Sequence, residues 1–114
     1  MAEVLIIDDD NLICDILVKM MEKLGHKSRY ALTGNQGLEL ARNGHFDIVF
    51  LDVMLPDASG LDLIKPIKAT ASSPEIIIIT GNSDPDGAEM AIKSGAWNYL
   101  AKPFLRQDLN LQVS

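Results

Sequence analysis

The polar side chains best suited to chemistry share one feature: each lies within three residues of the end of a short apolar run. They are Asp8, Asp9, Asp10, Asp52, Thr80 and Lys102. Asp52 is the clearest case, because residues 48–51 are typical of a strand buried on both faces and the carboxylate follows at once. Desolvating a lone carboxylate is costly, and no neighbouring residue in the sequence neutralises this one. Its partners must therefore come from other parts of the chain.

Short apolar runs alternate along the chain with segments whose apolar residues recur at helical spacing. The expected strands are residues 4–7, 28–32, 46–51, 75–79 and 97–101, and the expected helices are residues 12–24, 33–44, 59–67, 84–95 and 105–113. Strands that alternate with helices imply βαβ units and a parallel sheet with helices on both faces. Asp10, Thr33 and Asp84 stand where helix N-caps are expected. Pro66 lies inside the third helix and predicts a kink or a later helix start there.

The carboxyl ends of the strands are expected to lie on one edge of this sheet, where open α/β proteins bind ligands. The carboxylates of Asp8, Asp9 and Asp52 would then converge with the Thr80 hydroxyl and the Lys102 ammonium. Clustered carboxylates repel one another and invite a hard divalent cation such as Mg²⁺. With the three acids ionised, Mg²⁺ and Lys102 bring the formal charge of the site to zero. Such a site suits phosphoryl transfer, with a carboxylate as the nucleophile.

Length and composition set limits on the class of protein. The chain has 114 residues, 47% hydrophobic and 23% charged, which is ordinary for one soluble domain. A net charge of −6 argues against a direct nucleic-acid partner. Cys14, the single cysteine, excludes an intramolecular disulfide and a CxxC zinc site, and its apolar neighbours favour a buried thiol. The sequence has no signal peptide and no apolar stretch long enough to span a membrane, so a cytoplasmic location is expected.

The ordered set of these motifs resembles the receiver domain of two-component response regulators. The resemblance rests on an acidic pair after the first strand, Asp52 after the third, Thr80-Gly81 after the fourth and Lys102-Pro103 after the fifth. It covers residues 1–114, nearly the whole chain, as one receiver domain that could be part of a longer regulator. It implies a flavodoxin-like (βα)5 fold, a three-layer α/β sandwich with a parallel sheet of strand order 2-1-3-4-5.

The resemblance also implies roles for the acidic residues. Asp52 would be the phosphoacceptor, the residue that takes the phosphoryl group. Asp8 and Asp9 would hold Mg²⁺, joined by the Asp52 carboxylate and the backbone carbonyl of Met54. Thr80 and Lys102 would assist catalysis, since the family's threonine hydrogen-bonds a phosphoryl oxygen and its lysine pairs with the acyl phosphate.

Two further features of receivers carry over to named positions. Receivers usually have a cis peptide before the proline that follows this lysine, so Lys102-Pro103 is expected to be cis. Tyr99 occupies the family's switch-aromatic position, and Thr80 would be its partner in the switch.

Residues 83–104 resemble receivers of the nitrogen-regulation (NtrC-like) type, which control σ54-dependent activators.

The implied partners follow from the family. A sensor histidine kinase would donate the phosphoryl group. An output domain or partner protein would contact the fourth helix, fifth strand and last helix, and phosphorylation could promote a homodimer. Transcription regulation is the expected output. The domain would not be an enzyme in the usual sense, since its chemistry is limited to its own phosphorylation and dephosphorylation.

Two alternatives remain at this point. The stretch Asp8-Asp9-Asp10 and the strand that ends in Thr80 also resemble haloacid-dehalogenase-type phosphatases, in which Asp8 would be the nucleophile and Asp10 the acid/base. That interpretation leaves Asp52 without a role. The other alternative is a receiver-like binding module that is never phosphorylated.

Several remaining side chains have ordinary structural interpretations. Trp97 and Phe104 are expected to be packing residues. The other acids are expected to be turn, surface or capping residues: Asp57, Asp62, Asp84 and Asp86.

Overall fold

Strands and helices alternate along the part of the chain that the computed structural model describes, residues 1–80 and 85–101. The elements there are β1 (Glu3–Ile7), α1 (Asn11–Lys23), β2 (Lys27–Ala31), α2 (Gly34–Asn43), β3 (Ile48–Asp52), α3 (Gly60–Lys68), β4 (Glu75–Thr80), α4 (Pro85–Lys93) and β5 (Asn98–Ala101). Each strand expected from the sequence is present, and each of the first four expected helices is present. Their observed ends differ from the expected ones by a few residues.

The strands form one parallel sheet in the order β2-β1-β3-β4-β5. This is the flavodoxin-like order expected from the resemblance. The chain passes outward from β1 to β2 and then crosses back to β3 on the other side of β1. The connections after β1 and β3 therefore leave the sheet in opposite directions, and open α/β proteins bind ligands at the carboxyl ends of strands at such a point.

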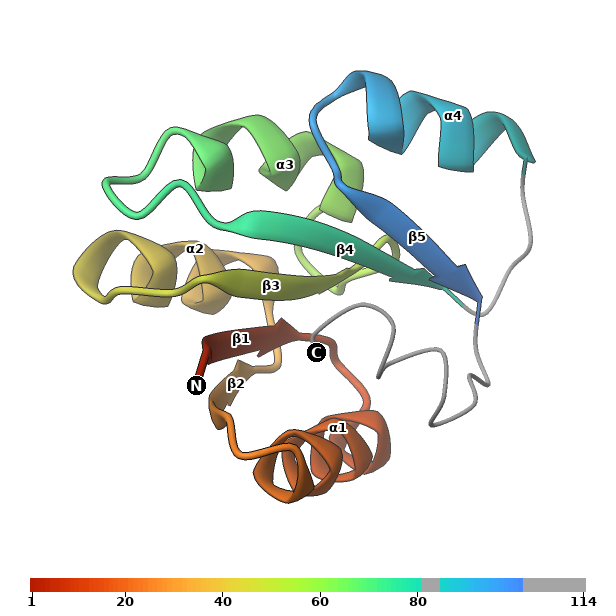
Figure 1. Cartoon of the computed structure of the whole chain (residues 1–114). Coiled ribbons are helices and arrows are strands. Elements are labelled where there is room, and N and C mark those ends of the chain that lie inside the picture. The colour runs from red at the N-terminus through yellow and green to blue at the C-terminus, as the bar shows by residue number, and fades with distance from the viewer. Residues whose placement is uncertain (81–84, 102–114) are drawn as a thin grey trace.

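The sheet is the middle of three layers, and Figure 1 shows α1 on one face and α2, α3 and α4 on the other. The α1 side chains Cys14, Leu17 and Met21 pack with strand residues such as Phe50. On the opposite face, residues of α2, α3 and α4 pack with alternate residues of the same strands. Both faces of the central strands are thus covered, which explains why these strands are continuous apolar runs instead of alternating ones.

Two helices begin where the sequence predicted. Asp10 is the N-cap of α1 and accepts a hydrogen bond from the Leu12 N–H at 2.9 Å. Thr33 is the N-cap of α2 and accepts from the Gln36 N–H at 3.1 Å. The α3 helix begins at Gly60 and continues through Pro66, so the later start that the sequence left open does not occur.

Trp97, expected to be a packing residue, is only partly packed, because it is 51% exposed. Its backbone N–H donates to the Ile76 carbonyl at 2.7 Å, which places it just before β5 at the amino end of this strand. In the described part of the chain β5 is an outer strand with one neighbour, β4. A side chain at that corner has fewer elements around it to cover it.

Five predictions fall on residues outside the described ranges. They are the Asp84 cap, the position of Lys102, the cis Lys102-Pro103 peptide, the packing of Phe104 and the last helix at residues 105–113. None of the described helices is long and apolar enough to cross a membrane.

Candidate acidic site at the carboxyl edge of the sheet

Three carboxylates meet at the ends of β1 and β3. Asp8, Asp9 and Asp52 each have a carboxylate oxygen within 4.8 Å of the others. The sheet causes this meeting: β1 and β3 are neighbours paired up to Ile7 and Leu51, so the residues that follow these two also lie side by side. Asp8 is fully buried, Asp52 is 5% exposed and Asp9 is exposed. The cluster is therefore buried on the sheet side and open to solvent through Asp9.

The three consecutive acids after β1 have different surroundings. Asp8 is held by the backbone around it: its Oδ1 accepts from the Asp10 N–H at 2.9 Å, and its own N–H donates to the Ala31 carbonyl at 3.1 Å. The Cys14 thiol donates to the Asp8 carbonyl at 3.4 Å, and Cys14 is buried as expected. Asp10 instead caps α1, which was its expected role.

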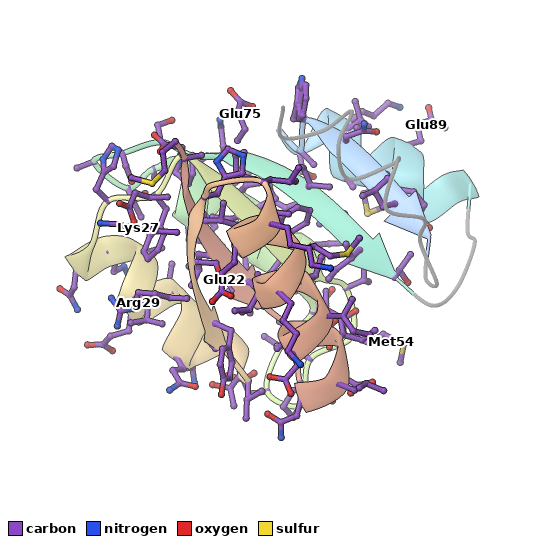
Figure 2. All side chains as sticks on the ribbon, turned by 60° about the horizontal axis from the view of Figure 1, so that its bottom comes forward. Glu22, Lys27, Arg29, Met54, Glu75 and Glu89 are labelled. Atoms are coloured by element: carbon purple, nitrogen blue, oxygen red, sulfur yellow. The ribbon has the colours of Figure 1, made fainter. Side chains whose placement is uncertain are left out.

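The connection from β3 to α3 lies close to the Asp52 main chain. The Met54 N–H donates to Asp52 Oδ1 at 3.3 Å, and the Gly60 N–H donates to the Val53 carbonyl at 2.7 Å. A Cβ at Gly60 would overlap the carbonyl oxygen of Asp52, so α3 can begin this close to β3 only with a glycine there. The Met54 side chain is 72% exposed and points away from the body of the protein (Figure 2). Its backbone is therefore the part that can contribute to the site.

The other two described site residues lie on the neighbouring strands. Thr80 ends β4 beside β3 and is 5% exposed. Tyr99 on β5 pairs with Ile78 and is partly buried against the apolar cluster beneath α2, α3 and α4. Because side chains alternate along a strand, Thr80 and Ile78 point to the same face of β4, and Tyr99 shares that face. The structure thus brings Thr80 and Tyr99 to one side of the sheet.

One acid of this region was not connected with the site from the sequence. Asp57, in the connection from β3 to α3, accepts from the N–H groups of Gly34 and Asn35 at 2.7 and 2.8 Å. These backbone hydrogen bonds, first that of Asn35 and then that of Gly34, hold the pKa of the Asp57 carboxyl below its usual value. The prediction of a turn, surface or capping acid is correct in kind. The helix α2 was expected from the sequence, but no local pattern connects it with Asp57, which lies more than twenty positions later.

The donor set decides which cation this cluster can hold. Three carboxylates offer hard oxygen ligands, which suit Mg²⁺ or Ca²⁺. Zinc sites favour histidine and cysteine, and the one such side chain packed here, Cys14, bonds the Asp8 carbonyl. Because Asp9 is exposed, solvent water can reach an ion held by the cluster. The side chains present therefore fit Mg²⁺.

Comparison with known proteins gives consistent matches. The family model described as "Response regulator receiver domain" matches residues 4–114. The transcriptional regulatory protein ZraR of Klebsiella oxytoca is 36% identical over 113 residues, which cover 99% of this chain and 26% of the relative. A response regulator from Burkholderia pseudomallei, solved with a phosphorylated aspartic acid, a calcium ion and citrate, is 31% identical with a TM-score of 0.92. The match covers all of this chain and 67% of that one.

A CheY-like receiver domain protein from Methanospirillum hungatei JF-1 is similar over nearly its full length. It is 27% identical with a TM-score of 0.92, and the match covers 99% of this chain and 90% of that one. By contrast, this chain spans 26%, 48% and 46% of three curated transcriptional regulators that it matches. The likeness to those regulators therefore concerns one part of each of them.

Proposed function

The chain belongs to the response regulator receiver domain family, and from this premise we propose that Asp52 accepts a phosphoryl group from a partner histidine kinase in a Mg²⁺-dependent step. A receiver is a signalling domain and not a classical enzyme. The observation that carries the proposal is the meeting of Asp8, Asp9 and Asp52 at neighbouring strand ends, with the Asp52 carboxylate almost fully buried. The phosphorylated aspartic acid of the Burkholderia pseudomallei response regulator supports it.

The chemical step is a transfer between two nucleophiles. An oxygen of the Asp52 carboxylate attacks phosphorus and forms the new O–P bond. The bond from phosphorus to the kinase histidine nitrogen breaks, and its electron pair leaves with that nitrogen. The product is an aspartyl phosphate, an acyl anhydride, and water restores the carboxylate by attacking phosphorus. The signal is therefore self-limiting.

The surrounding residues position charge for this transfer. Asp8, Asp9, Asp52 and the Met54 carbonyl would hold Mg²⁺, which when bound neutralises charge on the phosphoryl oxygens. The Met54 N–H, which donates to Asp52 Oδ1 at 3.3 Å, limits how the carboxylate can rotate. Lys102, which follows β5 directly in the sequence, would supply the second positive charge.

The switch is proposed to run from Thr80 to Tyr99. Phosphorylation adds negative charge and strong acceptor oxygens at Asp52, and the Thr80 hydroxyl would donate to one of them. Because Thr80 and Tyr99 share a face of the sheet, movement of Thr80 would open space into which Tyr99 can turn. The surface of α4 and β5, together with the last helix that the sequence predicts, would then change for an output domain, a partner protein or a second copy of the chain. Ile92, exposed on α4, belongs to that surface.

The phosphatase alternative loses its support. Its proposed acid/base, Asp10, caps α1, and the family match is to receivers. One experiment tests the present proposal and also distinguishes it from the phosphatase mechanism. The chain is treated with acetyl phosphate and Mg²⁺, the adduct is trapped by reduction, and the modified residue is mapped by mass spectrometry.

We expect the adduct on Asp52 and its loss in Asp52→Asn. Asp62→Asn is the matched control, because Asp62 is an exposed acid in the first turn of α3 and lies outside the cluster. An adduct on Asp8 would overturn the proposal in favour of the phosphatase mechanism. The absence of any adduct would favour the inert binding module.

A further inference from the structure

We propose that Asp57 is a positioning residue for the acidic site, because it ties the β3–α3 connection, which orients the Asp52 carboxylate, to the start of α2. The inference rests on the proposed function, since it concerns the same metal and phosphoacceptor site. Asp57 itself lies outside the cluster of Asp8, Asp9 and Asp52.

The contact between Asp57 and α2 uses both carboxylate oxygens. Oδ1 accepts from the Gly34 N–H at 2.7 Å and Oδ2 accepts from the Asn35 N–H at 2.8 Å. These are the first two residues of α2, and the N–H groups of a helix's first turn have no partner within the helix. A carboxylate is favoured there because it also faces the positive end of the helix dipole. The two bonds join parts of the chain separated by 22 and 23 positions.

Asp57 is not the only residue that caps the N-terminus of α2. Thr33 Oγ1 already accepts from Gln36 N–H, and the Thr33 carbonyl accepts from Gly37 N–H at 3.0 Å. The contribution of Asp57 is therefore a link between two elements as well as a cap. Space around this link is limited: a Cβ at Gly34 would come within 2.9 Å of Leu63 Cδ1 on α3 and 3.2 Å of Asp57 Oδ1.

The link reaches the site through a short closed loop. Residues 54 and 59 form an antiparallel bridge, and the Leu55 N–H donates to the Ala58 carbonyl at 3.3 Å. Asp57 lies at the tip of this loop, and Met54 at its base donates to Asp52 Oδ1. Fixing the tip against α2 limits the orientations available to the Met54 peptide. Met54 supplies two groups there: its N–H contacts the Asp52 carboxylate, and its carbonyl, in the next peptide, is the proposed metal ligand.

The first measurement is made without metal. In the Asp57→Asn variant, NMR-detected hydrogen exchange should become faster at the Gly34 and Asn35 amides, since one charged bidentate acceptor is lost. The second measurement is a Mg²⁺ titration that follows the Met54 amide shift. We expect the midpoint to rise by about 10-fold, the lower end of the range for residues that orient metal ligands.

Thr33→Ala is the control for helix stability. It removes a cap from the same end of α2 without touching the β3–α3 loop, so it should leave the Mg²⁺ midpoint unchanged. Asp62→Asn controls for the loss of one negative charge near this loop. A wild-type midpoint in Asp57→Asn, or an equal rise in Thr33→Ala, would overturn the inference.

If the proposed Mg²⁺ site itself is wrong, the Mg²⁺ titrations give a different result. In that case Asp9→Ala would retain the wild-type Mg²⁺ titration, because the ion would be bound elsewhere. If Asp9→Ala abolishes the titration and Asp57→Asn leaves it unchanged, the metal site stands and only the positioning role of Asp57 is refuted.

Discussion

Replacing Asp9 by alanine should stabilise the metal-free protein and remove its response to Mg²⁺. Asp9 is exposed, so truncating it leaves no internal cavity, and the change is mainly the loss of one charge. Its carboxylate lies within 4.8 Å of those of Asp8 and Asp52. Two unit charges at that separation repel by about 0.9 kcal/mol in water and by about 3.5 kcal/mol at an effective dielectric constant of about 20. Because Asp9 faces solvent, the smaller value applies to each pair.

The expected shift follows from the size of the chain. For 114 residues, a change of about 1 kcal/mol in the free energy of unfolding shifts the melting temperature by about 4 °C. Relief of two repulsions should therefore raise the melting temperature of Asp9→Ala in EDTA by about 4 to 8 °C. Wild type should gain about 1.4 kcal/mol, or about 6 °C, when Mg²⁺ reaches ten times its dissociation constant.

The assay is calorimetric melting of wild type and variant in EDTA and in Mg²⁺. Asp15→Ala is the control, because Asp15 is an exposed acid on α1 outside the cluster, and it should keep the wild-type difference between the two conditions. Two results would contradict the reasoning. A full Mg²⁺ response in Asp9→Ala would mean that the ion is bound elsewhere. A lower melting temperature than wild type in EDTA would mean that contacts of Asp9 outweigh the repulsion.

Three further changes test other parts of the structure. Thr80→Ala should still be phosphorylated, but little of the conformational change should reach Tyr99. NMR of the beryllofluoride-treated variant measures this change, and wild-type chemical shifts at Tyr99 would exclude Thr80 as the relay. Gly60→Ala should lower the free energy of unfolding by about 1 to 3 kcal/mol, typical of overpacking, because the new methyl group would meet the last peptide of β3; urea denaturation measures the loss. Asp47 accepts from the Glu3 N–H at 2.8 Å, and this bond is the main cause of its lowered pKa. The stabilisation that Asp47 contributes to the folded state should be complete above pH 3.8, the ordinary pKa of its carboxyl. It should be lost as the pH falls through the lower pKa of the folded state. Asp47→Asn should therefore be less stable near neutral pH and should show a shallower loss of stability in acid.

The sequence alone was sufficient for the order and type of the described elements. Residues 76–79 are four isoleucines, and in an α/β protein such a run is typical of a strand that is covered on both faces. The caps Asp10 and Thr33 were also predictable, because a capping side chain bonds an N–H only two or three residues away. The convergence of Asp8, Asp9 and Asp52 followed from one topological rule, since the carboxyl ends of parallel strands share an edge.

Only the tertiary structure decided features that depend on distant residues. Asp8 and Asp9 are identical neighbours, yet one is buried and the other exposed, because the neighbouring strands and α1 surround only Asp8. Trp97 is half exposed because of its place at the corner of an outer strand. The partners of Asp57 lie more than twenty positions away in α2. Periodicity and capping rules describe interactions across a few residues, whereas burial and long-range hydrogen bonds depend on how the elements pack, which no local pattern encodes.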